Sequence, residues 1–258
     1  MDKIIEIRQN TRMELMSGRG ELCTCDCGKP KFPKTSKYHI LSINSSQTMN
    51  TKIIEKRSSI IDILKKYNRP LKIMEIGVMA GDFAYTLYKN LNIDKMVLID
   101  PFNLNDSMSM DGNPRFTPET HFSYVCNRFI DNHNVEVIQG LSGDVLPKMF
   151  LTADENNKFD FIYIDSNHEF YNTYNEILYA SQLIKQNGII GIDDYTLSLD
   201  DPVVVHEVMQ AVTKFLDNNR EWKVIYYSFN DAGIPNIYLS KMFETEHPRL
   251  DSNQRQTD

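Results

Sequence analysis

The sequence predicts a doubly wound α/β fold built on a mainly parallel, seven-stranded sheet. Short aliphatic runs alternate with longer amphipathic segments from residue 71 onward, and helices between strands imply parallel crossover connections. The last two runs are separated only by a short turn, Asn230-Asp231-Ala232-Gly233, which predicts an antiparallel terminal hairpin. A length of 258 residues suits one such domain with a modest extension.

Composition and charge exclude several classes of protein. Apolar residues at 41% and charged residues at 24% are ordinary for a globular chain and argue against disorder throughout. The net charge of −7 gives no general attraction for a phosphate backbone, so nucleic acid is not an expected partner. The longest apolar runs, near 161–164 and 189–192, are far shorter than the roughly 18 residues of a membrane span. The start of the chain lacks the apolar stretch of a secretory signal, so we expect a cytoplasmic protein.

The amino-terminal part is expected to be an extension of the main domain. Apolar spacing over 3–16 and over 50–67 favours helices, and the Gly- and Pro-containing stretch from Gly18 to about Ser46 favours a connecting segment. We therefore divide the chain into an extension at 1–68, a regular domain at 69–241 and a disordered tail at 242–258.

Within the regular domain the elements follow one another in a strand–helix order. The expected strands are 71–76, 96–100, 135–139, 159–164, 188–192, 222–229 and 234–240. The expected helices are 81–90, a segment near 118–131, 144–151, 169–186 and 202–218. The irregular segment 102–120 is either a lid over a binding site or a surface loop.

Three of the four cysteines are crowded into one short segment. Cys23, Cys25 and Cys27 suggest a zinc or redox site, but alternate spacing turns Cys25 away from the other two in an extended chain. No histidine nearby completes a four-ligand set. Reduced thiols in a surface loop are the favoured interpretation.

The first strand is followed by a glycine-containing turn of the kind that approaches ligands. Gly77 and Gly81 allow a tight turn into a helix N-terminus, although a turn without a ligand is the alternative. A dinucleotide fingerprint would need glycine at the positions of Met79 and Asp82, so NAD and FAD are disfavoured. Asp100 follows at the end of the second strand, where a carboxylate can hold ribose hydroxyls. An acidic strand end with few glycines favours a nucleoside without a pyrophosphate, such as S-adenosylmethionine.

Later strands end in further carboxylates. Asp165 follows the strand at 159–164, and Asp193 and Asp194 follow the strand at 188–192. Carboxylates at neighbouring strand ends repel one another unless a cation or a proton intervenes, which favours an oxygen-ligated divalent cation. The alternative is that one or two of them cap the following helices, with Asp194 the strongest capping candidate.

Over about residues 70–240 these motifs make the chain resemble the class I S-adenosylmethionine-dependent methyltransferases. Within that class it is similar to the metal-dependent O-methyltransferases, including macrocin and, more distantly, catechol O-methyltransferase. The resemblance implies a Rossmann-like fold in which 75–81, with Glu75, Gly77 and Gly81, binds the methionine part of the cofactor. It also implies that Asp100 binds the ribose and that Gly140-Leu141-Ser142-Gly143-Asp144, through Ser142 and Asp144, lies beside the adenine. The implied ligands of Mg²⁺ or Mn²⁺ are Asp165, Asp193 and Asp194.

His168 indicates the acceptor class by the same resemblance. Catechol-type enzymes place lysine three residues after the first metal-binding aspartate, whereas sugar-modifying relatives place histidine there, as in this chain. His168 is then the expected general base, kept neutral by the neighbouring cation, although a solvent-facing histidine in the first helical turn is the alternative.

The function expected from these observations is metal-dependent O-methylation of a sugar hydroxyl. The resemblance extends to bacterial enzymes that methylate nucleotide-activated heptoses for capsular polysaccharide, so a sugar or nucleotide-sugar is the expected small-molecule partner. A macrolide, phenolic or other natural product is the alternative acceptor. A catalytically silent S-adenosylmethionine-binding partner domain is the alternative of another class, and a homo-oligomer is compatible with both.

Overall fold

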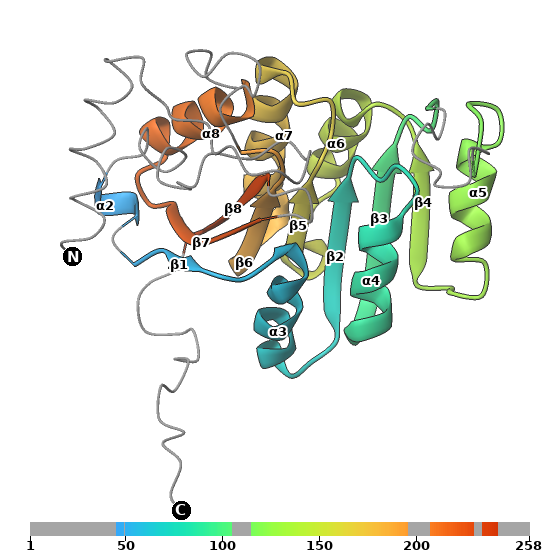
Figure 1. Cartoon of the computed structure of the whole chain (residues 1–258), viewed down its shortest axis with the longest axis horizontal. Helices are drawn as coiled ribbons and strands as arrows, with labels where there is room; N and C mark the ends of the chain where they lie inside the picture. Colours follow the sequence, from blue (N-terminus) through green and yellow to red (C-terminus); the bar gives the residue numbers. More distant parts are fainter. Residues whose placement is uncertain (1–44, 49, 105–114, 196–206, 230–233, 242–258) are drawn as a thin grey trace, which may run out of the picture.

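The computed structural model describes residues 45–48, 50–104, 115–195, 207–229 and 234–241 (Figure 1). Several expectations lie outside these residues: the helix at 3–16, the cysteine cluster at 23–27, most of the 102–120 segment, the turn at 230–233 and the tail at 242–258. In the described part, no helix is long and apolar enough to cross a membrane.

The predicted α/β fold is confirmed, with one strand more than expected. The strands are β1 (Lys52–Ile53), β2 (Leu71–Ile76), β3 (Ile93–Asp100), β4 (Val135–Gln139), β5 (Phe159–Ile164), β6 (Ile184–Ile192), β7 (Lys223–Phe229) and β8 (Pro235–Ser240). Their order in the sheet is β1-β7-β8-β6-β5-β2-β3-β4. β8 runs antiparallel to both β6 and β7, as the expected terminal hairpin requires, and the other pairs are parallel.

The extra strand, β1, corrects the helix expected over 50–67. Lys52 and Ile53 pair with Tyr226 and Tyr227 of β7 at the edge of the sheet, and the α-helix of this segment is only α3 (Ile60–Leu64). A two-residue edge strand carries no periodicity of its own, because pairing with a strand far along the chain creates it. The apolar spacing of 50–67 therefore predicted one long helix where the chain forms a strand and a short helix.

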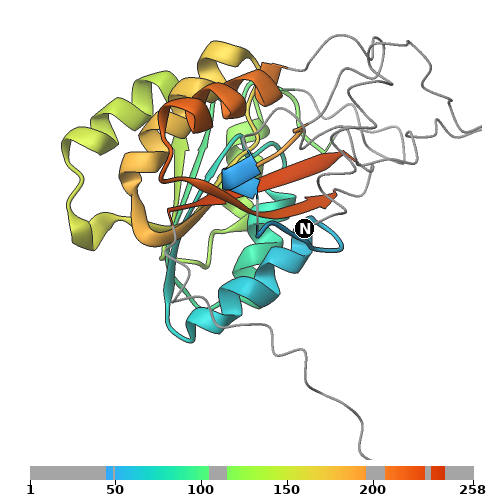
Figure 2. The same ribbon diagram turned by 90° about the vertical axis from the view of Figure 1, so that its left-hand side faces the viewer.

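Two layers of helices cover the two faces of the sheet (Figures 1 and 2). One face packs against α3, α4 (Asp82–Asn90) and α5 (His121–Arg128). The other packs against α6 (Ser142–Leu151), α7 (Phe170–Leu183) and α8 (Glu207–Asn218). A further short helix, α2 (Ser45–Thr48), lies beside β7.

The central strands are buried on both faces because helices cover both. All six residues of β5 are buried. Phe161 and Tyr163 belong to the apolar cluster under α3–α5, and Ile162 and Ile164 belong to the cluster under α6–α8. This alternation is the two-residue period of a strand, and burial on both faces explains why the strand is apolar throughout except at Asp160.

The register of the central strands aligns the residues that follow them. The Asp165 amide donates to the carbonyl of Ile76 at 2.8 Å, and the Asp193 amide donates to the carbonyl of Ile164 at 2.9 Å. The Gly77 amide donates to the carbonyl of Ile99 at 2.9 Å. The first residues after β2, β5 and β6 therefore form one row at the carboxyl edge of the sheet, beside Asp100 of β3.

Candidate active site

The turn between β2 and α4 depends on glycine at two positions. Gly77 has φ +82° and Gly81 has φ +73°, a region that residues with a Cβ rarely adopt. A Cβ on Gly77 would lie 1.9 Å from the backbone oxygen of Asp165. Gly77 is thus required for close packing against the strand end that carries Asp165, whereas the sequence suggested close approach to a ligand.

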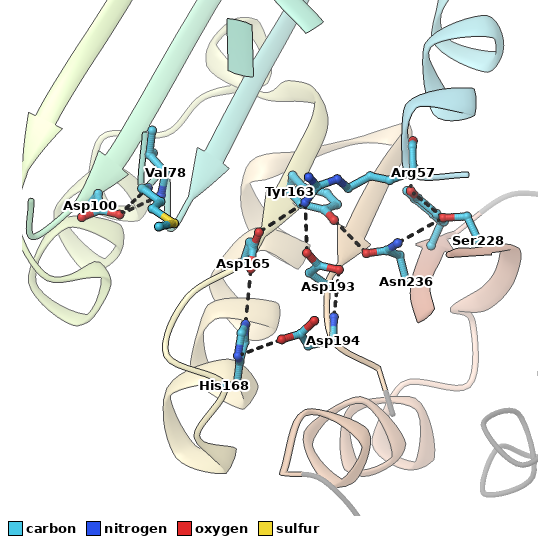
Figure 3. A network of polar contacts seen from close by, with 12 residues as sticks. Arg57, Val78, Asp100, Tyr163, Asp165, His168, Asp193, Asp194, Ser228 and Asn236 are labelled. Carbon is cyan, nitrogen blue, oxygen red and sulfur yellow. Dashed lines mark hydrogen bonds and ion pairs between the residues drawn. The ribbon is translucent and has the colours of Figure 1, made fainter. Parts of the chain in front are cut away.

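Asp100 organises this turn from the neighbouring strand (Figure 3). Its Oδ2 accepts hydrogen bonds from the amides of Val78 at 2.7 Å and Met79 at 3.0 Å. Its Oδ1 accepts from the amide of Phe102 at 2.6 Å. The carboxylate is 5% exposed, so these contacts anchor the loops after β2 and β3 to each other. The ribose contact expected of Asp100 stays a prediction.

Glu75 lies beneath the turn, in the last part of β2. It is 2% exposed, and its Oε2 has no hydrogen-bond partner among the described residues. Burial, together with the charges of Asp165, Asp100 and Asp193, raises the pKa of Glu75 well above its usual value. Burial thus favours the protonated form of Glu75, and one of its oxygens is left over for a ligand or for water.

Left-handed backbone conformations cluster at the same edge of the sheet. Four of the non-glycine residues with positive φ are Met79 (48°), Phe102 (49°), His168 (60°) and Asp194 (52°), one after each of β2, β3, β5 and β6. Such conformations cost free energy for residues with a Cβ, and they persist where the surroundings hold the chain in place. Their concentration at one edge is typical of a functional site.

Asp165, Asp193 and Asp194, which we call the acid cluster, come together as the sequence predicted (Figure 3). The guanidinium of Arg57, a positive charge that the sequence did not suggest, lies between Asp165 and Asp193. Arg57 Nη1 lies 3.1 Å from Oδ2 of Asp193 and 3.5 Å from Oδ2 of Asp165. Burial and the charge of Asp165 outweigh the effect of Arg57 and raise the pKa of Asp193 to about 8.

His168 links the other side of the acid cluster. Its Nε2 lies 3.3 Å from Oδ1 of Asp165, and its Nδ1 lies 3.2 Å from Oδ2 of Asp194. Burial alone would lower the pKa of His168, but the hydrogen bond with Asp165 and the charges of Asp194, Asp165 and Asp193 raise it. The neutral imidazole expected beside a metal cation stays a prediction, because this shift reflects the protein side chains alone. His168 also precedes the helix, since α7 begins at Phe170, and does not lie in its first turn.

The donor chemistry of the acid cluster fits a divalent cation, but its present arrangement does not. Carboxylate oxygens are the ligands that Mg²⁺ and Mn²⁺ prefer. Yet Arg57 and His168 occupy the facing oxygens, and no group of three or more His, Cys, Asp or Glu side chains in the described ranges is placed to hold a metal. A metal would have to displace at least one of these side chains.

The residues expected near the adenine differ in their surroundings. Ser142 donates to Oε1 of Glu176 at 2.6 Å, and Ser166 donates to Oε2 of the same carboxyl group at 2.7 Å. Glu176 is 2% exposed and ties the segment after β4 to the segment after β5. Asp144 lies exposed in the first turn of α6. Ser142 thus has a structural contact that the sequence did not indicate, and the adenine contacts stay predictions.

Sequence reasoning missed two charged residues of the site. The sequence did contain a signal for Glu176, because its spacing from Ile177 and Ala180 puts a carboxylate on the apolar face of α7. Arg57 had none, because it lies 108 residues from Asp165 and 136 from Asp193 along the chain.

A buried polar network lies behind Arg57. The hydroxyl of Tyr163 donates to Oδ1 of Asn236 at 2.9 Å, and the amide of Asn236 donates to the hydroxyl of Ser228 at 3.3 Å. The hydroxyl of Tyr238 donates to the backbone oxygen of Arg57 at 3.5 Å. Through Tyr238, strand β8 thereby contacts the backbone of Arg57.

Comparison with known proteins agrees with this fold. Residues 74–195 match a family described as a methyltransferase domain. No curated protein matches the chain. Among solved structures, the O-methyltransferase TomG from Streptomyces achromogenes, involved in tomaymycin synthesis and bound to S-adenosylmethionine, is 18% identical with a TM-score of 0.52, covering 71% of this chain and 78% of that one. An O-methyltransferase from Bacillus cereus, in complex with S-adenosylhomocysteine, is 16% identical with a TM-score of 0.51, covering 92% and 98%.

At these identities the solved structures show the fold, and the family match gives the domain that this part of the chain resembles. The family match over 74–195 agrees with the methyltransferase expected from the sequence. Residues 74–195 are similar to a methyltransferase domain, and the chain has the Rossmann-like fold of the solved O-methyltransferases.

Proposed function

We propose that this protein is a cytoplasmic S-adenosylmethionine-dependent O-methyltransferase that acts on a hydroxyl of a small sugar or nucleotide-sugar. One observation carries the proposal: Asp165 and Asp193 lie in one row with Gly77 at the carboxyl edge of the sheet, beside Asp100, and His168 contacts the acid cluster there. Ligands of doubly wound sheets bind at this edge. A methyl donor at the turn and an acceptor at the acid cluster would therefore be neighbours.

The cofactor would lie over the turn that joins β2 to α4. Gly77 and Gly81 allow the left-handed backbone of this turn, and Glu75 offers its unpartnered oxygen from below. Asp100 accepts three described N–H donors, and a carboxylate has about four acceptor positions, so one remains for a ribose hydroxyl. We assign the adenine end to the start of α6, at Ser142 and Asp144.

The acceptor would be activated by His168 and the acid cluster. His168 is flanked by two carboxylates that orient its ring, and a general base needs such a fixed position before its pKa matters. Asp165, Asp193 and Asp194 would hold Mg²⁺ or Mn²⁺. When bound, the cation supplies positive charge that makes the acceptor hydroxyl easier to deprotonate.

A sugar acceptor is favoured by the identity of residue 168. Histidine there is what the resemblance associates with sugar-modifying methyltransferases, and a nucleotide-activated heptose of capsular polysaccharide synthesis is the acceptor that we place first. We assign catalysis to a unit spanning 69–241, to which Arg57 is added from the preceding segment.

The test is methyl transfer from labelled S-adenosylmethionine to a panel of nucleotide-sugars, followed by mass spectrometry. We expect turnover that is lost in excess chelator and restored by Mg²⁺ or Mn²⁺, and that is not restored in Asp165→Asn. Asp62→Asn is the matched control, because Asp62 is an exposed carboxylate on α3 away from the site. Full turnover in excess chelator would overturn the metal assignment. Methylation of phenolic acceptors alone would overturn the sugar assignment.

A further inference from the structure

We propose that Arg57 and a divalent cation compete for the same pair of carboxylates, Asp165 and Asp193. Arg57 is the resident counter-ion of this pair, and the cation binds only when the guanidinium moves away. The inference rests on the metal site of the proposed function and adds a residue that controls access to it.

The positions of the charges carry the inference. One nitrogen of Arg57 lies between Oδ2 of Asp165 and Oδ2 of Asp193, at 3.5 and 3.1 Å. A cation that bridges these carboxylates has to take the same place. The guanidinium is charged at every accessible pH, and two positive groups so close together would repel each other strongly in a half-buried site.

The surroundings of Arg57 show how it can be both held and displaced. Its guanidinium carbon lies 4.7 Å above the ring of Phe83 and 5.9 Å from the ring of Tyr163. The rings hold the guanidinium end, and the Tyr238 hydroxyl holds the backbone oxygen. The side chain is nevertheless 28% exposed, whereas that of Asp193 is 5% exposed. Arg57 therefore has a route toward solvent, and the buried carboxylate does not.

Arg57 also explains how the acid cluster is tolerated without a metal. Buried carboxylates facing each other are costly unless a positive charge offsets them. Arg57 offsets two of them from a segment outside residues 74–195, the part that matches the methyltransferase domain. Access of the cation to these carboxylates is therefore controlled by a residue of the amino-terminal extension, and not by the matched domain.

The experiment measures Mn²⁺ binding to chelator-treated, full-length protein by titration calorimetry and by electron paramagnetic resonance. We expect Arg57→Gln to bind Mn²⁺ at least about tenfold more tightly than the unmodified protein, because the competing charge is gone. Adding Asp193→Asn to Arg57→Gln is expected to abolish the gain. Arg69→Gln is the matched control, since Arg69 pairs with Asp160 at the other end of β5 and should leave Mn²⁺ affinity unchanged.

The outcomes separate this inference from the proposed function. Equal Mn²⁺ affinity in the unmodified protein and in Arg57→Gln would overturn the competition and leave the metal site standing. Absence of Mn²⁺ binding in both, with methyl transfer in excess chelator, would overturn the metal site and the competition with it. If circular dichroism shows that Arg57→Gln is unfolded, Arg57→Met serves instead, because it removes the charge and keeps apolar contact with Phe83.

Discussion

At the scale of single residues, His168 is the group whose role can be tested most directly. It is held by Asp165 and Asp194 in a left-handed backbone conformation immediately before α7. General bases are typically worth about 10²–10⁴ in rate. We expect His168→Ala to lower turnover by a factor in that range, with nearly unchanged affinity for S-adenosylhomocysteine, measured by steady-state kinetics and calorimetry.

The control for this prediction is His133→Ala, because His133 is exposed in the segment before β4. Turnover of His168→Ala within a few-fold of the unmodified enzyme, with chemistry shown to limit the rate, would make His168 a bystander. The base would then have to be sought among Asp193, Asp194 and bound water.

At the scale of the elements, the amino end of β5 is held by a buried charge cluster on the side opposite the site. Asp160 is 1% exposed and accepts hydrogen bonds from Arg69, Lys185 and the backbone amide of Lys72. Burial acts to raise the pKa of Asp160, but the hydrogen bonds from Arg69, Lys72 and Lys185 outweigh it and lower the pKa.

A lowered pKa means that Asp160 contributes stability above its unfolded pKa of about 3.9 and loses it as pH falls through the lower folded value. We expect Asp160→Asn to reduce the free energy of unfolding by about 3 kcal/mol at pH 7, because it removes a buried ion-pair partner. The difference should shrink steadily below pH 4. Urea denaturation at a series of pH values measures it, and a difference independent of pH would show that the charge of Asp160 is unimportant.

The elements also show where sequence patterns succeed. The strands at 71–76, 135–139 and 159–164 begin and end as predicted, because each is rich in aliphatic or aromatic residues and is bounded by polar or turn residues, although only 71–76 and 159–164 are largely buried. Strands β3 and β6 begin earlier than predicted, at Ile93 and Ile184, because residues 93–95 and 185–187 are partly or fully exposed and mixed in character. The helix expected near 118–131 spans only His121–Arg128.

At the scale of the whole molecule, cofactor binding should raise the stability of the folded protein. A ligand that binds only the folded state at about 100 times its Kd adds about 2.7 kcal/mol. We expect S-adenosylhomocysteine to raise the melting temperature by several degrees in scanning calorimetry. NADH should have no effect.

The matched variant for this measurement is Asp100→Ala. It should weaken cofactor binding by about 1–3 kcal/mol, because three backbone amides and a ribose hydroxyl would lose their acceptor. Its own melting temperature without ligand separates damage to the turn from lost binding. A shift with NADH and none with S-adenosylhomocysteine would contradict the assigned cofactor.

By itself, the amino-acid sequence determined the order of strands and helices, the glycine turn at 77–81 and the strand ends that carry Asp100, Asp165 and Asp193. These features are local, because hydrophobic period and turn chemistry act over a few residues. Only the tertiary structure decided what neutralises the carboxylates, that Gly77 packs against the backbone of Asp165, and that 52–53 forms a strand. Those contacts join segments far apart in the chain, and Arg57 reaches Asp193 across 136 residues through a fold that no short pattern encodes.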